Sequence, residues 1–135
     1  MNTEAQASRP QSARPLSPHL QIWRFTPSMA ASITHRFTGV INYGGLLLVG
    51  VWLASLAFAP ELYSAVAGFA RSPLGLIIIA GFVWSLSYHL LNGLRHLYWD
   101  TGRGLAPATA KKTSIAVYAG SVVLAAVILW AGLGA

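Results

Sequence analysis

The chain has 135 residues, of which 55% are hydrophobic and only 9% are charged, and its mean hydropathy is +0.56. This length gives room for one domain, and a soluble domain of this size could not bury so much apolar surface, so the composition favours a membrane protein. The chain has no cysteine, which excludes disulfides, thiolate zinc sites and cysteine-ligated iron–sulfur clusters within it.

The N-terminal residues 1–24 are polar and contain several prolines, serines and arginines, without the apolar core of a secretory signal peptide. A mitochondrial presequence is a weaker interpretation, because the prolines oppose an amphipathic helix. We expect residues 1–13 to be a disordered leader and residues 14–25 to form an ordered extended segment on the cytoplasmic surface. Residues 14–135 then form a membrane anchor.

Three apolar segments follow, at about residues 33–58, 74–99 and 114–133. Each is near or above the roughly 20 residues that a helix needs to cross a bilayer, and lipid leaves no other open-ended structure with its backbone satisfied. The stretches APEL and RSP separate the first apolar segment from the second, and TGRGLAP separates the second from the third. Residues 59–73 are therefore predicted as a connecting loop. The sequence therefore predicts an all-α membrane protein with three transmembrane helices.

Basic residues gather on one side of this predicted topology. The loop between the first two spans carries a single basic residue, Arg71, together with Glu61. The positive-inside rule then predicts a cytoplasmic N-terminus and second loop and a periplasmic C-terminus. The net charge of +6 follows this topology and requires no nucleic acid partner. The basic residues on the predicted cytoplasmic side are Arg9, Arg14, Arg24, Arg36, Arg95, Arg103, Lys111 and Lys112.

The second span carries polar residues along one face. They recur every three or four positions, so they line one side of a helix. His89 lies roughly 15 Å inside the end near Trp99, counting about 1.5 Å of rise per residue. An ionisable group at that depth is costly and normally faces protein, a cofactor or a proton route. The residues of this face are Ser85, His89, Asn92, Gly93 and His96.

The first span begins with SITHRFTG, which places Ser32, His35, Arg36 and Gly39 within its first two turns. Because the second span ends on the same side of the membrane, the two polar groups can meet at one depth. Neutral imidazole is a common haem-iron ligand, and arginine can hold a porphyrin propionate with two hydrogen bonds. A quinone needs a similar but smaller apolar slot with polar donors.

Structural interpretations compete with these for several residues. His96 and His19 fit an interfacial position as well as a chemical role, and Ser32 and Ser85 fit helix packing or a bond to their own helix. Arg95, Arg103 and the two lysines fit topology determinants. His89 is favoured for function by its depth, with haem ligation and proton relay both open.

Two long motifs of the chain are RPLSPHLQIWRFTPSMAASITHRFTG at residues 14–39 and HLLNGLRHLYWDTG at residues 89–102. Both resemble motifs of the cytochrome b-type membrane-anchor subunits of succinate dehydrogenase. The resemblance implies a three-helix anchor that pairs with a second small membrane-anchor subunit. The two anchors hold a flavoprotein subunit and an iron–sulfur subunit at the membrane and share one haem b. Trp23 departs from the tyrosine that many relatives carry, and it remains an interfacial aromatic residue.

The resemblance also implies roles for individual residues. His89 matches the axial ligand of the haem iron, and His35 and Arg36 match positions near the haem propionates. Ser32 and Arg36 match the ubiquinone site. The chain is then not catalytic alone but serves electron transfer from succinate to ubiquinone.

Three other functions remain open at this point. The same architecture serves as a fumarate reductase anchor, where electrons run in the opposite direction. A haem-free docking scaffold and a small proton-coupled carrier using His89 as a relay are the others. The short leader favours a bacterial inner membrane over the mitochondrial inner membrane.

Overall fold

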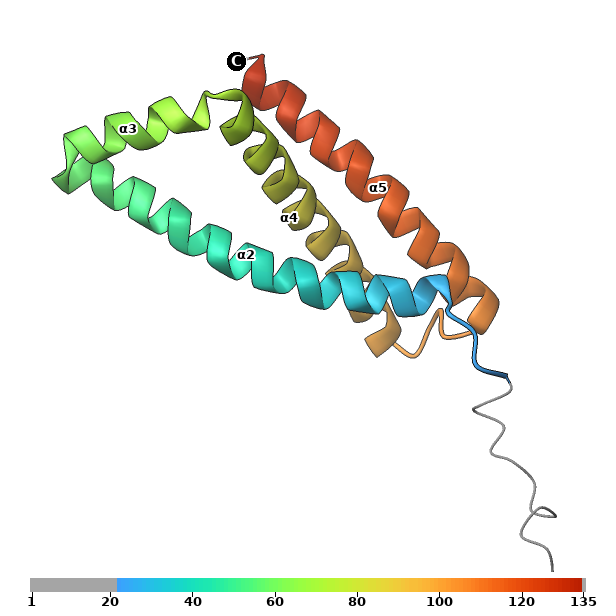
Figure 1. Ribbon diagram of the computed structural model, residues 1–135. Coiled ribbons are helices and arrows are strands. Elements are labelled where there is room, and N and C mark those ends of the chain that lie inside the picture. Colours follow the sequence, from blue (N-terminus) through green and yellow to red (C-terminus); the bar gives the residue numbers. More distant parts are fainter. Residues whose placement is uncertain (1–21, 135) are drawn as a thin grey trace, which may run out of the picture.

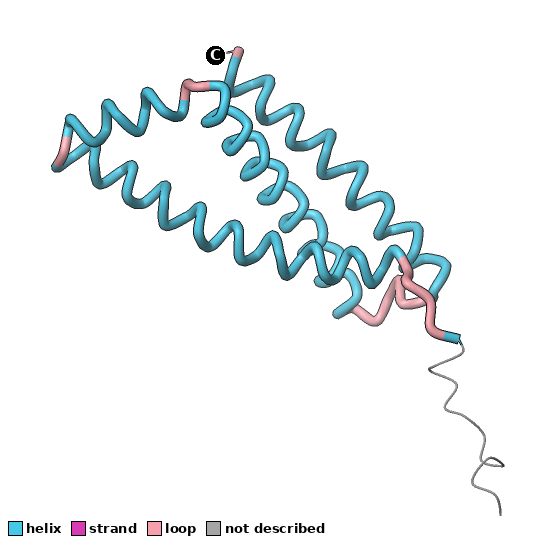
Figure 2. The backbone as a smooth tube through the Cα atoms, in the orientation of Figure 1, coloured by secondary structure: helices cyan, strands magenta, loops and turns pink. Residues whose placement is uncertain are grey.

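The computed structural model describes residues 22–134, which form four helices and no strand. The helices are α2 (Pro27–Phe58), α3 (Pro60–Ala70), α4 (Pro73–Asp100) and α5 (Pro107–Leu133). Short loops join them, as the backbone tube in Figure 2 shows. Among the described residues, α2, α4 and α5 are long and apolar enough to cross a membrane. The predicted all-α class with three membrane-length helices is therefore confirmed.

Proline marks the start of every one of these helices. A proline at the first helical position loses nothing, because its missing N–H would have no partner there anyway. Side-chain caps reinforce two starts: the Thr26 hydroxyl accepts from the N–H of Met29, and the Ser72 hydroxyl accepts from the N–H of Gly75. The prolines at the helix starts are Pro27, Pro60, Pro73 and Pro107.

The helices enclose the three predicted spans, and two of them begin well before the predicted start. α2 begins six residues before the predicted start at 33, and α5 begins seven residues before 114. Apolar character identifies only the lipid-buried part of a helix. The first turns are more polar, and they are marked by proline in both helices and by the Thr26 cap in α2. The predicted leader at 1–13 and most of the predicted extended segment at 14–25 lie outside the described residues.

The first connection is a helix and not the predicted loop. Ala59 interrupts the chain with φ −147° and ψ 75°, and α3 then begins at once with Pro60. Its 11 residues are too few to cross a bilayer. The stretch APEL thus ends one helix and starts another, because proline is compatible with the first turn of a helix as well as with its termination.

The three long helices meet at one end of the bundle, and α2 diverges from α4 and α5 toward the other end (Figure 1). α4 packs against both α2 and α5. The start of α2 lies near the end of α4, and α3 bridges the gap where α2 and α4 have diverged. An apolar cleft of about 410 Å³ lies between α2 and α3. It is lined by Leu48, Val51, Trp52, Ala65, Val66 and Phe69.

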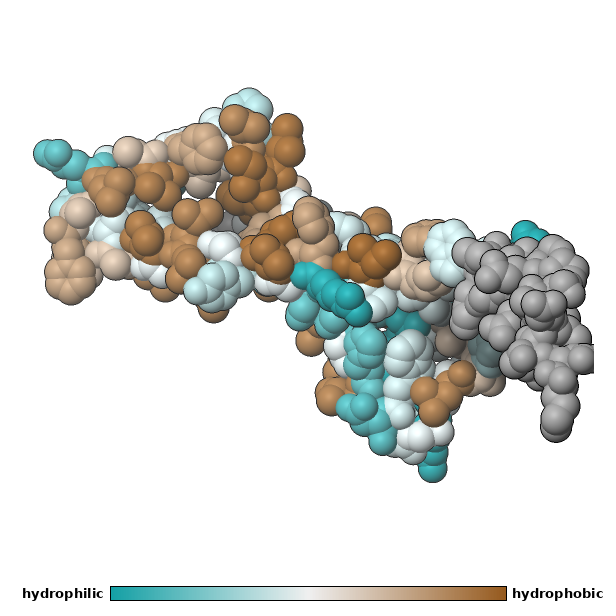
Figure 3. Space-filling model, turned by 60° about the horizontal axis from the view of Figure 1, so that its bottom comes forward, coloured by the Kyte–Doolittle hydropathy of each residue, from teal (hydrophilic) through white to brown (hydrophobic). Residues whose placement is uncertain are grey.

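The contacts between the helices are largely polar. Ala31, Tyr88, Val117 and Ala125 are the buried hydrophobic residues of the described chain. Brown apolar side chains cover much of the visible face in Figure 3, with hydrophilic residues gathered chiefly in one cluster. Polar and small residues inside with apolar residues outside is the pattern of helices packed in lipid. The buried polar residues are Thr38, Ser55, Ser85, Ser87, Asn92, Arg95, Ser114 and Ser121.

Candidate haem and quinone site

The polar groups of α2 and α4 meet at the convergent end of the bundle. The rings of His35 and His89 are stacked, with centroids 4.0 Å apart and planes at 12°. The ring of His96 lies 5.3 Å from that of His35 in a tilted arrangement. The expected meeting of the two spans is therefore observed, and we call His35, His89 and His96 the histidine cluster.

Hydrogen bonds fix the orientation of the His89 ring. Its Nδ1 lies 3.2 Å from the hydroxyl of Thr38 and 3.2 Å from the backbone carbonyl of His35. A carbonyl oxygen can only accept, so a bond to the His35 carbonyl requires the tautomer in which Nδ1 carries the proton and donates. The Thr38 hydroxyl in turn donates to the same carbonyl at 2.9 Å. In that neutral tautomer Nε2 of His89 keeps its lone pair, and no described residue forms a hydrogen bond with Nε2.

This arrangement is the one that metal-bound histidines use, in which the other ring nitrogen donates to a carbonyl and sets the tautomer. The described residues contain no group of three or more histidine, aspartate or glutamate side chains that could hold a metal ion. A metal bound through Nε2 of His89 must therefore bring most of its ligands with it. A haem does so, because the porphyrin supplies four nitrogens and leaves the axial positions to the protein.

Two further features of the histidine cluster fit a bound group. Nδ1 of His35 is buried and has no hydrogen-bond partner among the described residues, and an unsatisfied buried polar atom is costly. Gly39 lies directly against His89, because a Cβ there would be 3.2 Å from Cε1 of that ring. Gly93, one turn from His89 on α4, has open space where a Cβ would project. These residues fit a porphyrin beside α4.

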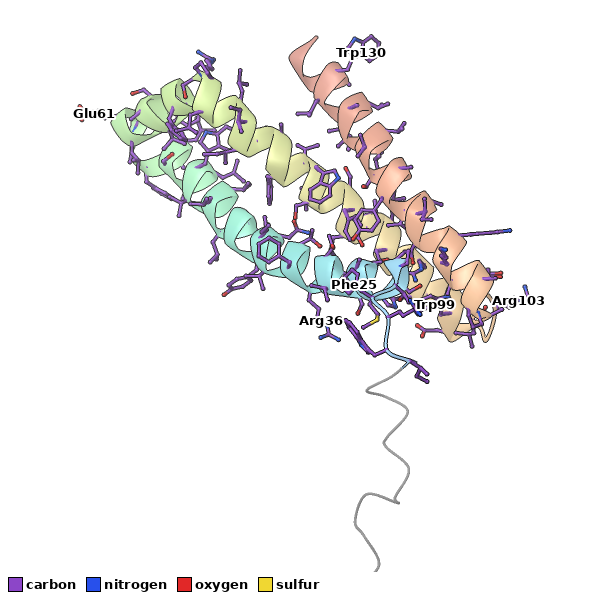
Figure 4. All side chains as sticks on the ribbon, turned by 45° about the vertical axis from the view of Figure 1, so that its right-hand side comes forward. Phe25, Arg36, Glu61, Trp99, Arg103 and Trp130 are labelled. Carbon is purple, nitrogen blue, oxygen red and sulfur yellow. The ribbon has the colours of Figure 1, made fainter. Side chains whose placement is uncertain are left out.

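Ser32 and Arg36 lie at the same end of α2 but outside the stacked rings. Ser32 is half-buried and Arg36 is exposed, and Figure 4 shows the Arg36 side chain pointing outward from the helix. Neither side chain forms a hydrogen bond with another described residue. The chain therefore has an exposed guanidinium and a half-buried hydroxyl near the histidine cluster.

The other predicted polar residues of α4 hold the helices together. Ser85 donates to the side-chain oxygen of Asn42 at 2.7 Å and lies 3.3 Å from the carbonyl of Thr38. Its bonds thus cross to α2 and do not return to its own helix. The sequence did not predict a role for Asn42, although Asn42 lies one turn after Thr38 on the same face of α2.

Arg95 is buried and therefore packs between helices, which is a role in addition to its interpretation as a topology determinant. It is only 6% exposed. Its Nη1 donates to the side-chain oxygen of Asn92 at 2.9 Å, and its Nε donates to the Thr113 hydroxyl at 3.2 Å. Its guanidinium carbon lies 4.0 Å from the ring centroid of Trp99. Arg95 lies three residues after Asn92 and four residues before Trp99, and this spacing could have predicted both contacts from the sequence.

A comparison with known families matches residues 10–128 to the succinate dehydrogenase/fumarate reductase transmembrane subunit. This match covers most of the chain. The chain belongs to that family. The family relationship confirms the resemblance found in the two motifs.

Individual members of the family are similar to this chain over most of its length. The succinate dehydrogenase cytochrome b556 subunit of Paracoccus denitrificans is 46% identical over 116 residues, covering 86% of this chain and 89% of that protein. The cytochrome b556 subunit of Rickettsia felis is 32% identical over 117 residues, covering 87% and 90%. The mitochondrial cytochrome b560 subunit of Mus musculus is 42% identical over 111 residues, covering 78% of this chain and 64% of that longer protein.

Proposed function

We propose that this chain is the haem b membrane-anchor subunit of a succinate:ubiquinone oxidoreductase. The observation that carries the proposal is the geometry of His89: its Nδ1 lies 3.2 Å from the His35 carbonyl, and this arrangement favours the tautomer that leaves the lone pair on Nε2. His89 lies within α4, which is long and apolar enough to cross a membrane. The similar subunits of Paracoccus denitrificans and Rickettsia felis are named cytochromes b556 of succinate dehydrogenase. Their names support a haem b here.

His89 would bind the haem iron as one axial ligand, and a second small anchor subunit would supply the other. When bound in this way, a haem would supply transfer of single electrons. His35 and Arg36 would contact the propionates. The buried, unpartnered Nδ1 of His35 and the ability of a guanidinium to bind a carboxylate with two hydrogen bonds support these assignments.

Ser32 and Arg36 would bind ubiquinone. Both lie in the first turns of α2 beside the histidine cluster, and neither is occupied by a hydrogen bond within the described chain. A hydroxyl and a guanidinium can donate to a quinone carbonyl and stabilise negative charge on its oxygen during reduction. The apolar surface of the surrounding helices suits the ring and tail of the quinone.

The orientation and partners follow from the charge distribution and the family. The convergent end of the bundle carries Arg36, Arg95 and Arg103, so the positive-inside rule assigns this end to the cytoplasmic side. The iron–sulfur and flavoprotein subunits would dock there and deliver electrons from succinate to the quinone. Relatives in bacteria support a bacterial inner membrane as the location.

The test replaces His89 with alanine in the assembled complex. We expect the low-spin b-type haem spectrum to disappear or to change strongly, because the iron loses an axial ligand. Leu90→Ala is the matched control, since Leu90 is the exposed neighbour of His89 on the same helix. A wild-type haem spectrum in His89→Ala would show that another residue ligates the iron.

A further inference from the structure

A buried arginine at the end of α4 lacks an acidic partner. Arg95 is 6% exposed, and no carboxylate of the described residues forms an ion pair with it. Its Nη2 and the neighbouring Nδ2 of Asn92 are buried without hydrogen-bond partners in the described chain. Burial of a charge is costly unless other groups compensate for it. The contacts of Arg95 therefore show which groups offset the cost of burying its guanidinium.

Trp99 compensates for part of this cost, in addition to the hydrogen bonds of Arg95 to Asn92 and Thr113. The guanidinium carbon of Arg95 lies 4.0 Å from the centroid of the indole ring, and the ring face attracts the cation. On its other side, the indole N–H of Trp99 donates to the carbonyl of Gly104 at 3.2 Å. Gly104 adopts a positive φ of 74°, which glycine permits without strain. The loop after α4 and the arginine within α4 thus hold one aromatic ring between them.

Trp99 connects this cation to the histidine cluster. The rings of Trp99 and His96 meet edge to face, with centroids 5.2 Å apart and planes at 83°. His96 then lies 5.3 Å from His35, whose ring stacks on that of His89 at 4.0 Å. A continuous series of ring contacts therefore joins Arg95 to His89. Trp99 lies at the same end of the bundle as Arg36 and Arg103 in Figure 4.

We propose that Arg95 is a positioning residue for the histidine cluster. It holds the plane of Trp99, the ring of Trp99 fixes His96, and His96 keeps the His35 ring against His89. This inference rests on the proposed haem-binding function.

Lysine could not replace this arginine fully. A planar guanidinium can stack on an indole while its separate N–H groups reach Asn92 and Thr113. The ammonium group of lysine is a single compact charge without that shape.

The charge of Arg95 predicts the direction in which the haem midpoint potential should change when this residue is replaced. Residues 89 and 95 are separated by about 9 Å along the helix axis, at about 1.5 Å per residue. A positive charge at this distance in a low-dielectric site disfavours the more positive, oxidised state of the bound haem. Removing the charge should therefore lower the midpoint potential.

The experiment uses the complete complex, purified from a host in which the chain is supplied as a variant. Four variants are compared: Arg95→Gln, Arg95→Lys, Trp99→Leu and Trp99→Phe. Haem content, the electron paramagnetic resonance spectrum of the oxidised haem and its midpoint potential are measured for each. Arg103→Gln is the control, because Arg103 is exposed in the loop after α4 and outside the series of ring contacts.

We expect Arg95→Gln and Trp99→Leu to keep haem but to shift its resonance spectrum, since the histidine rings change orientation. Arg95→Gln should also lower the midpoint potential, whereas Arg95→Lys should keep the potential near the wild-type value and still shift the spectrum. Trp99→Phe retains a ring face for Arg95 and a ring edge for His96, so its spectrum should stay close to wild type.

Wild-type spectra and potentials in both Arg95→Gln and Trp99→Leu would overturn the proposal. A loss of haem would also overturn it if the remaining haem kept the wild-type resonance spectrum. If these two variants fail to assemble, Thr113→Val decides, because it removes only the hydroxyl that accepts from Nε of Arg95; an unshifted spectrum there also refutes the proposal. Failure of the proposed function is distinguishable, because it is read from the presence of haem in His89→Ala.

Discussion

Gly39 is the position at which the smallest chemical change should disturb the His89 ring. Alanine at this position adds one methyl group to α2, and its Cβ would lie 3.2 Å from Cε1 and 3.8 Å from Nδ1 of His89. Ordinary contacts begin at 3.4 Å, so the ring or the helix must move by a few tenths of an ångström. His89 cannot rotate freely to absorb this change, because His35 stacks on it.

The cost of Gly39→Ala follows from the two hydrogen bonds of Nδ1. Both are already 3.2 Å long, so a further few tenths of an ångström would weaken them strongly. Hydrogen bonds between membrane helices contribute about 0.6 kcal/mol each on average. Losing both would cost about 1 kcal/mol, which corresponds to a roughly fivefold weaker hold on a group bound through Nε2.

The assay compares Gly39→Ala with Gly44→Ala in the purified complex. Gly44 lies on the same helix and has no atom within 4 Å of an added Cβ, so it reports the effect of alanine alone. We expect Gly39→Ala to shift the resonance spectrum of the oxidised haem and to speed haem loss in detergent. Identical spectra and loss rates in the two variants would refute the inferred contact between Gly39 and the His89 ring.

Two other predictions concern the quinone site and the packing of the helices. Ser32→Ala or Arg36→Ala should lower quinone reductase activity by about 10-fold or more, as expected for a lost hydrogen bond to charge, while succinate oxidation by an artificial dye persists; equal loss of both activities would contradict the assignment. Gly45→Ala should destabilise the complex by about 1–3 kcal/mol, because its Cβ would overlap the ring of Phe82. Thermal denaturation should show this loss, its relief by Phe82→Ala, and no loss in Gly50→Ala, where an added Cβ meets open space.

The sequence was sufficient to predict the long helices, because backbone N–H and C=O groups in lipid must form hydrogen bonds within their own segment. A run of about 20 apolar residues must be helical in a bilayer, whatever its neighbours are. The connection at α3 was harder, because Pro60 is compatible with both the end of one helix and the start of the next. The polar starts of α2 and α5 depend on local features that hydropathy does not measure: a proline at both starts and the Thr26 cap at α2.

The meeting of His35 and His89 was predictable because both residues lie at one depth on antiparallel helices. The roles of Asn42 and Arg95 were not, since they depend on how each helix is rotated about its axis. A rotation that turns Arg95 toward α5 converts an apparent surface charge into a buried donor to Thr113. Such rotation is set by side-chain contacts between helices, and residue spacing within one helix does not determine it.

The largely polar interior of this bundle has a consequence for its biogenesis. In water the chain would gain little by collapsing in its native arrangement, because its apolar surface faces outward and its hydroxyl groups face inward. Each long helix must therefore enter the bilayer first, and lateral association follows as a separate stage. Because that second stage rests on weak individual bonds, orphaned copies of the chain should be degraded quickly unless companion subunits reach them in the membrane.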